Sequence, residues 1–132
     1  MGVVVINGTR YEGNNEPKNV SAENGEWYES ISDAIAAGND EITLGDGTFT
    51  MPDNLQGGAV IEGNGENTVL NMEDKVCSYY NNVTFRNLAM NVGTGNYKGL
   101  QHSSNIAYDN CVINGVMWLY TTSTFTNCTF NI

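Results

Sequence analysis

Three stretches of the chain share one seven-residue pattern: an apolar residue, a polar residue, Asn, an apolar residue, a variable residue, an apolar residue and a second Asn. They are Phe85–Asn91, Tyr108–Asn114 and Phe125–Asn131. Position 108 lies 23 residues after position 85, and position 125 lies 17 residues after position 108. A repeat of about 20 residues that contains no helical pattern is typical of a solenoid of short strands.

The repeat extends towards the N-terminus in each unit. Eight residues before each lead aromatic residue, another run of strand-forming residues begins; these runs are Cys77–Tyr80, Leu100–Ser103 and Met117–Tyr120. A second strand is predicted to end at the lead aromatic residues Phe85, Tyr108 and Phe125. A third is predicted to begin just after the first Asn, at Leu88, Cys111 and Cys128. Each coil is therefore predicted to contain three strands.

A single Asn separates the second strand of each coil from the third, and these residues are Asn87, Asn110 and Asn127. A bend this sharp needs a residue that tolerates a positive φ, which Asn does at low cost because its amide bonds locally. Stacked Asn side chains can also bond to one another in a ladder. Hairpin turns of a β-sandwich are the alternative, but they would not repeat Asn in one register three times.

The part of the chain before residue 77 shows this repeat less regularly. Strand patterns interrupted by Gly-rich turns occupy Glu41–Phe49 and Gly58–Leu70. A helix is predicted over residues 27–37, most clearly 28–37, with Ser30 or a nearby polar residue as its N-terminal cap and Gly38 beyond its C-terminus. This helix is expected to cover the open end of the first coil.

The first 26 residues form a separate segment in this interpretation. Strands at Val3–Ile6 and Thr9–Tyr11 would flank a turn at Gly8 and form a small hairpin, followed by a polar loop to Glu26. The predicted organisation is thus a hairpin and cap segment over 1–26 and a β-helix domain over 27–132.

From the helix onwards the chain resembles the pectin-lyase-like superfamily of right-handed parallel β-helices. The resemblance covers roughly residues 27–132 and rests on the helix with Ile42–Phe49, on Val60–Gly65 with Thr68–Leu70, and on the aromatic-x-Asn-apolar coils. It implies an all-β, right-handed, single-stranded parallel β-helix with three strands per coil and about five coils. The sequence looks most like the β-helical segments of repetitive surface and adhesin-type proteins of gut bacteria. This fold also hosts lyases, hydrolases, esterases and phage tailspikes, so it does not define an activity.

Charge and hydropathy exclude several partners. The chain has fifteen acidic and five basic residues and a net charge of −10, which does not support a phosphate-binding track for nucleic acid. Its longest apolar run, Val3–Ile6, is too short to span a membrane or to form a signal-peptide core. The acidic, Asn-rich and Thr-rich composition favours an extracellular or cell-surface location, with any export signal outside this chain.

The three cysteines leave at least one thiol unpaired within the chain. Cys111 and Cys128 occupy the column that Leu88 occupies one coil earlier, which predicts an inward apolar stack of reduced cysteines. A disulfide between adjacent coils is the alternative, although parallel inward side chains rarely supply its torsion. The only His, His102, lies in a different column and is predicted to be a hydrogen-bonded core residue, so no metal site and no cofactor are predicted.

No catalytic residues are predicted. Enzymes of the resembled fold use an Arg with acidic calcium ligands, three Asp on adjacent coils, or two Asp with Gln and Arg, and the first strands here carry no such set. Two carboxylates placed for acid–base chemistry are missing from that face. Arg86 and Asp109 share a column on neighbouring coils and are predicted to form a weak surface ion pair. No calcium ligand run of the D-x-D type is present.

Exposed aromatic residues on the first strands form the candidate binding face. Alternation from an inward Cys77, Leu100 and Met117 places the candidate residues outwards, and they are Tyr80, Gln101, Ser103, Trp118 and Tyr120. Sugar rings stack on aromatic rings while amides and hydroxyls bond the sugar hydroxyls, so this face is a candidate site for a polysaccharide or host glycan. The alternative is that a loop, a neighbouring domain or another copy covers these rings.

Two main classes of function and a third possibility follow from the sequence. The favoured class is a non-catalytic module of a bacterial cell-surface or secreted adhesin-like protein. The alternatives are the N-terminal part of a polysaccharide-degrading lyase or glycoside hydrolase of this fold, and a phage tailspike module. Residues 122–132 complete a coil without a cap, so further coils or domains of a longer parent protein are expected, or else a contact with another copy.

Overall fold

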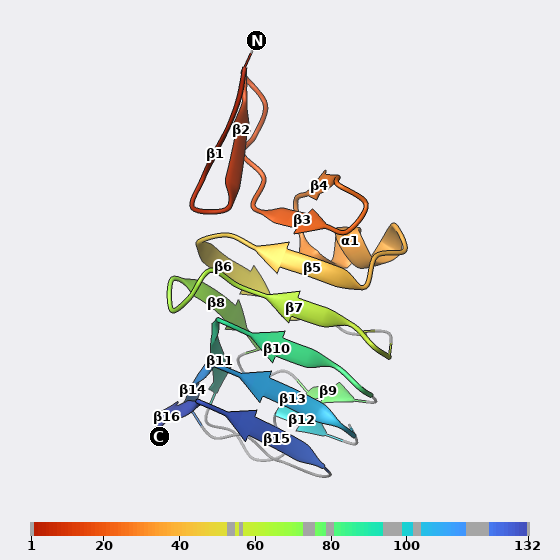
Figure 1. Ribbon diagram of the computed structural model, residues 1–132, viewed down its shortest axis with the longest axis vertical. Coiled ribbons are helices and arrows are strands. Elements are labelled where there is room, and N and C mark those ends of the chain that lie inside the picture. Colours follow the sequence, from red (N-terminus) through yellow and green to blue (C-terminus); the bar gives the residue numbers. More distant parts are fainter. Residues whose placement is uncertain are drawn as a thin grey trace.

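The computed structural model describes residues 2–52, 55, 57–72, 76–78, 81–93, 99–101, 104–115 and 122–131, with the backbone alone at 76–78, 93 and 99–101. The described residues form an all-β parallel solenoid of about three turns with almost no helix (Figure 1). The parallel solenoid confirms the prediction from the repeat, whereas the predicted number of about five coils stays a prediction. No helix among them is long and apolar enough to cross a membrane.

Two sheets build the body of the solenoid, and the strands of successive coils pair in parallel within each. The first has seven strands in the order β15-β13-β10-β7-β5-β3-β4, and the second has five in the order β16-β14-β11-β8-β6. The strands of the first sheet within the coils are β5 (Glu41–Leu44), β7 (Val60–Glu62), β10 (Thr84–Arg86), β13 (Ile106–Asp109) and β15 (Ser123–Thr126). Those of the second are β6 (Gly47–Thr50), β8 (Thr68–Asn71), β11 (Ala89–Gly93), β14 (Val112–Gly115) and β16 (Thr129–Asn131).

The predicted first strands of the coils form a third, smaller sheet. Its two described strands are β9 (Val76–Ser78) and β12 (Gly99–Gln101), which pair in parallel with Leu100 beside Cys77 and Gln101 beside Ser78. This register is the one that the sequence repeat predicts for these positions. The run Met117–Tyr120 lies outside the described residues.

The core consists of inward columns, because alternate residues of a strand face opposite sides and parallel pairing keeps equivalent residues in line. In the seven-stranded sheet one column runs through Ile42, Ile61, Phe85, Tyr108 and Phe125. The rings of Phe85 and Tyr108 stack with centroids 5.7 Å apart, and those of Tyr108 and Phe125 stack at 4.6 Å. Stacked aromatic rings add attraction beyond the burial of their area, so this column joins coil to coil.

A matching column lines the five-stranded sheet. It consists of Phe49, Leu70, Met90, Ile113 and Phe130, each paired in register with the next. The first four are buried, whereas Phe130 on the outermost strand is 52% exposed. The apolar core therefore fills the inner coils and reaches the surface at the last one.

The N-terminal end of the solenoid is covered by a strand and a short helix. The predicted helix exists but is shorter, spanning α1 (Ile31–Ala36), and the Ser30 hydroxyl accepts a hydrogen bond from the Asp33 amide at 3.0 Å. The predicted start at residue 27 is wrong because Trp27–Tyr28 is a strand, β4, that pairs with β3 (Val20–Ala22). This capping arrangement is seen above the stack in Figure 1.

Strand β3 also corrects the prediction of a polar loop up to Glu26. It runs antiparallel to β5, with Val20 beside Leu44 and fully buried. An unpaired edge of a sheet presents free backbone donors and acceptors, so a chain segment placed there gains backbone hydrogen bonds whatever its own strand propensity. The pairing with β5, rather than the local sequence, thus makes residues 20–22 a strand.

The predicted N-terminal hairpin is confirmed. β1 (Val3–Ile6) and β2 (Thr9–Glu12) pair antiparallel around Asn7 and Gly8, which have φ of 50° and 79°. Positive φ at both turn residues is the requirement of a two-residue hairpin turn, and Asn-Gly meets it. The Asn7 carbonyl accepts a hydrogen bond from the Asp46 amide at 2.9 Å, so the turn is held against the first coil.

Gly45 sets how closely the hairpin approaches the solenoid. A Cβ atom at Gly45 would lie 2.5 Å from the backbone carbonyl of Gly8. We predict that Gly45→Ala releases the hairpin from the first coil because neither backbone can move aside without losing the Asp46 hydrogen bond. Hydrogen exchange measured by mass spectrometry should then speed up in residues 3–12 and stay slow in the inner strands. The matched change Gly57→Ala, at a glycine without positive φ where the added Cβ meets only the Asn81 carbonyl oxygen at 3.4 Å, should leave the hairpin protected; equal exchange in both variants would contradict the prediction.

Candidate functional site

The predicted aromatic binding face falls largely outside the described residues. Tyr80, Ser103, Trp118 and Tyr120 are not among them, and neither is His102. Gln101 lies on β12 beside Ser78 of β9, with only its backbone described. The structure thus places one backbone position of this face, and the face itself stays a prediction.

The Asn turns between the two large sheets are described in full. Asn87, Asn110 and Asn127 have φ of 54°, 56° and 52°. The Asn110 amide donates to the Asn87 amide oxygen at 2.8 Å, and Asn87 in turn donates to the Glu62 carboxylate at 3.1 Å. Asn87 thus accepts from the coil after it and donates to the coil before it, so these bonds help to fix the spacing of the coils.

Two further Asn ladders run along the solenoid. In one, Asn131 donates to Asn114 at 2.9 Å and Asn114 donates to Asn91 at 3.2 Å. In the other, Asn105 donates to Asn82 at 2.9 Å, and both residues have φ of 57°. These ladders were not predicted, although the sequence indicates them through the second Asn of the repeat and through an Asn three residues before Phe85 and Tyr108.

The inward cysteines are free thiols, as predicted. Cys111 is buried, and its thiol donates to the Phe85 carbonyl at 3.4 Å. Cys128 is half-buried and makes the same contact one coil later, to the Tyr108 carbonyl at 3.3 Å. Burial raises the pKa of the Cys111 thiol to about 11, so this group is a small core residue and is poorly suited to act as a nucleophile.

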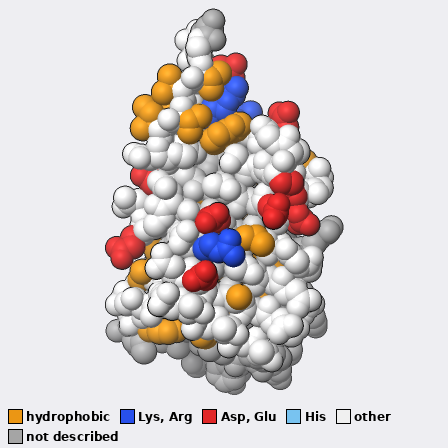
Figure 2. Space-filling model, viewed as in Figure 1, with side chains coloured by type: hydrophobic (Ala, Val, Ile, Leu, Met, Phe, Trp, Pro, Cys, Tyr) orange, Lys and Arg blue, Asp and Glu red, His pale blue; other side chains and the backbone are white. Residues whose placement is uncertain are grey.

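The outer face of the seven-stranded sheet carries a charged column (Figure 2). Arg86 lies between Glu62 and Asp109 on the neighbouring coils. Its Nε is 3.7 Å from the Asp109 carboxylate, with both side chains about half exposed, which confirms the predicted surface ion pair. A pair this exposed contributes little stability.

A shallow groove of about 280 Å³ runs from this column towards the capping strand. At its upper end the Glu23 carboxylate accepts the backbone amides of Asp40 at 3.1 Å and Glu41 at 3.4 Å. A hydrogen bond between the carboxyls of Glu23 and Asp40 lowers the pKa of Glu23 and raises the pKa of Asp40. Within the described ranges no group of three or more His, Cys, Asp or Glu side chains could hold a metal ion.

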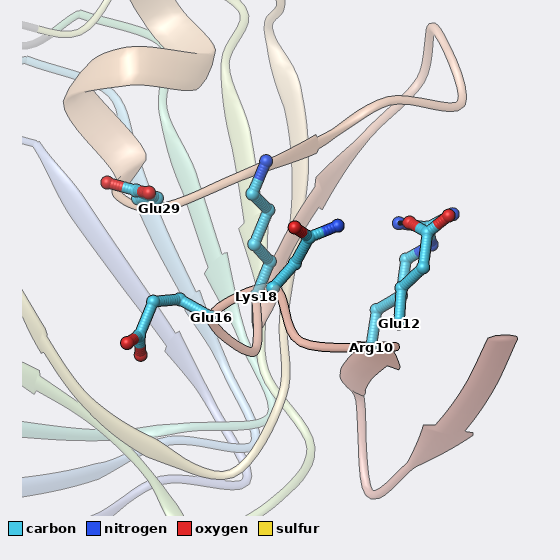
Figure 3. A pocket seen from close by; sticks show the side chains of 6 residues that line it. Arg10, Glu12, Glu16, Lys18 and Glu29 are labelled. Atoms are coloured by element: carbon cyan, nitrogen blue, oxygen red, sulfur yellow. Dashed lines mark hydrogen bonds and ion pairs between the residues drawn. The ribbon is translucent and has the colours of Figure 1, made fainter.

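A second cavity of about 220 Å³ lies where the hairpin meets the cap (Figure 3). Its lining residues are all polar, and they are Arg10, Glu12, Asn15, Glu16, Lys18 and Glu29. Arg10 and Glu12 are paired at 2.6 Å, and Lys18 lies between this pair and Glu29 in the view of Figure 3. The cavity depends on the docking of the hairpin, which explains why no local sequence pattern indicates it.

Comparisons with models of known protein families, with curated proteins and with solved structures found no match to this chain. The class of protein is therefore defined by the fold alone: a parallel β-solenoid whose coils are joined by Asn ladders and a stacked aromatic column.

We predict that Asn110 stabilises the solenoid through both its backbone conformation and its ladder bond. Asn110→Gly keeps the positive φ and loses the bond to Asn87, at a cost of roughly 0.5–1.5 kcal/mol. Asn110→Ala also forces a left-handed conformation on Ala and should cost about 1–2 kcal/mol more. Urea unfolding midpoints measure both, with Asn14→Ala, an exposed Asn outside the ladders, as the control. Equal losses of stability in the Gly and Ala variants would contradict the prediction, because they would show that the positive φ at position 110 has no effect on stability.

The free energy of unfolding should fall at alkaline pH because the Cys111 thiol and the Tyr108 hydroxyl are buried in their protonated forms. The Cys111 thiol has a pKa of about 11 in the folded chain, against about 8.5 in an unfolded one, and burial also raises the pKa of Tyr108. Between these values the unfolded state has lost protons that the folded state keeps, so the free energy of unfolding decreases as pH rises from about 8.5 to about 11, by at most roughly 1.4 kcal/mol per pH unit for one thiol. Chemical unfolding at several pH values should show a shallower decline for Cys111→Val; an identical decline would contradict the assignment.

Proposed function

We propose that the chain is a non-catalytic β-solenoid module of a bacterial cell-surface or secreted adhesin-like protein. The observation that carries the proposal is the repetition of the same contacts from coil to coil: Asn ladders at two bends and along the five-stranded sheet, an aromatic column and in-register parallel strands. A structure built from identical neighbour contacts is stiff along its axis and forms a long, even surface.

The resemblance to pectin-lyase-like proteins supports a finer description of the fold. Under this proposal the solenoid is right-handed, has about five coils and belongs with the parallel β-helices of that superfamily. The support comes from the sequence repeat, from the capping helix and from the parallel pairing of the coils. An extracellular location accords with the acidic, Lys-poor composition.

We further propose that the module binds a polysaccharide or host glycan through its first strands. The parallel pairing of β9 and β12, with Gln101 beside Ser78, supports stacked first strands whose outward residues form columns. Continuing this register would bring Tyr80 and Ser103 into one row, with Trp118 and Tyr120 on the following coil. Aromatic rings spaced along the axis would suit an extended chain of sugars.

The first test is binding of the purified chain to a broad glycan array. The proposal predicts binding that falls at least tenfold in Trp118→Ala and in Tyr120→Ala, because each ring supplies a stacking surface. Tyr11→Ala is the matched control, since Tyr11 is a 45% exposed aromatic residue on the distant hairpin. The absence of binding by the intact chain would remove the glycan site and leave a structural module.

Catalysis is tested separately on any glycan that binds. Incubation followed by an assay for new reducing ends and for unsaturated products would detect hydrolysis and elimination. The proposal predicts neither product, and either one would replace it with the alternative of a polysaccharide-degrading enzyme.

A further inference from the structure

The cavity between the hairpin and the cap is lined by charged groups of both signs. Its volume of about 220 Å³ equals the share of roughly seven water molecules in the liquid. Two basic residues, three acidic residues and one amide line it, and they are Arg10, Lys18, Glu12, Glu16, Glu29 and Asn15. In Figure 3 the pair Arg10 and Glu12 lies on one side of Lys18, and Glu16 and Glu29 lie on the other. Opposite charges therefore face one space from different sides.

Backbone hydrogen bonds hold the two basic residues next to each other. Arg10 and Lys18 exchange backbone bonds of 2.7 and 3.1 Å in an antiparallel bridge, and residues directly opposite in such a bridge project from the same face. Glu12, two residues after Arg10 on β2, projects from that face as well. The Asn15 amide donates to the Glu12 carbonyl at 3.0 Å, which fixes the turn that follows the strand. The positions of the two cations are thus set by the backbone.

Most of the bonding capacity of these charged groups is unused. Arg10 donates from one nitrogen, Nη1, to Glu12 at 2.6 Å, and a guanidinium has five N–H donors. Within the described part of the chain, the Lys18 ammonium has neither a hydrogen bond nor an ion pair. The carboxylates of Glu16 and Glu29 also lack partners among the described residues. The cavity therefore has free cationic donors and free anionic acceptors, and it is complementary to a ligand that carries both charges.

We propose that this cavity binds a small zwitterion such as a free amino acid, with the ligand carboxylate at Lys18 and Arg10 and the ligand ammonium group at Glu29 and Glu16. The two basic residues are half-buried, where water weakens the attraction for a carboxylate less than at the surface. The two Glu are exposed at the rim. A purely anionic ligand would meet three carboxylates and a purely cationic one would meet two cations, so a ligand with both charges is favoured.

The bound zwitterion also joins the hairpin to the cap. Arg10 lies on β2, Lys18 lies in the segment after the hairpin, and Glu29 directly precedes Ser30, the N-terminal cap of α1. A ligand that contacts all three residues holds these segments together and stabilises the docked hairpin in proportion to its occupancy. Hydrogen exchange in residues 3–12 should therefore slow when the ligand is present.

The test is titration of the whole chain with glycine, β-alanine and γ-aminobutyrate, followed by nuclear magnetic resonance of the backbone amides. These probes carry the same two charges at increasing separation. Glycinamide, which lacks the carboxylate, and N-acetylglycine, which lacks the ammonium group, are the control ligands. At least one zwitterion should shift the amides of residues 10–18 and 29 and bind at least tenfold more tightly than either control ligand. No shift with any zwitterion, or equal binding of a control ligand, would overturn the proposal.

Variants of the chain test the two ends of the ligand separately. Lys18→Met and Glu29→Gln should each weaken binding of the zwitterion, the first at least tenfold, because each removes one charge partner. Arg86→Met and Glu26→Gln remove the same charges outside the cavity and should bind as the wild-type chain does. Gly45→Ala, which releases the hairpin and changes no lining residue, should abolish binding. Circular dichroism verifies that each variant is folded, and unchanged affinity in either lining variant would overturn the proposal.

Discussion

The stacking of equivalent residues in register is the constraint on which the rest of the structure depends. Parallel strands of neighbouring coils pair in line, apart from a shift between Asn91 and Gly93 of β11, so a side chain in these strands meets its own counterpart one coil away. Such a stack favours side chains that interact well with an identical side chain one coil away. Asn does so through an amide that donates on one side and accepts on the other, as Asn110 and Asn87 do at 2.8 Å. Aromatic rings do so by stacking, as Tyr108 and Phe125 do at 4.6 Å. Charges of like sign repel one another, and the column of charged residues on the outer face of the seven-stranded sheet alternates in sign from Glu62 through Arg86 to Asp109.

The same constraint explains the two kinds of residue at the bends. The turn between the large sheets has no room for a loop, and each coil must leave its strand at the same place, so a residue with φ near +55° is needed at one position of every repeat. Gly would meet the conformational demand but could not bond to its neighbour. Asn meets both demands, which is why backbone geometry and side-chain ladder coincide at Asn87 and Asn110. Inside the bend, Cys111 and Cys128 place a small thiol within reach of the carbonyl of the aromatic residue one coil earlier.

The repeat predicted the solenoid, its parallel pairing and the inward columns, since these follow from period and alternation. The cap was predicted less well, because its strands are determined by what they pair with. Residues 20–22 contain only one strongly apolar residue and look like loop, yet the edge of β5 makes them a strand. Trp27–Tyr28 were predicted to be helical, but they pair with β3 as a strand, and the helix begins at Ile31 after its cap Ser30. The cavity lined by Arg10, Lys18 and Glu29 could not have been predicted, because it exists only once the hairpin turn lies against Gly45. The proposed sugar-binding residues fall mainly outside the described part of the chain, so their arrangement still rests on the repeat.

The end strands of a solenoid lack the neighbours that pair with the backbone of each inner strand. Every inner strand satisfies its backbone with two neighbours, and the ends must satisfy theirs with something else or leave a template exposed. At one end this chain uses its own residues, turning β3 against the direction of the stack so that the parallel ladder cannot continue. The acidic surface acts in the same sense, because repulsion between neighbouring molecules that each carry a net charge of −10 disfavours pairing between exposed strands.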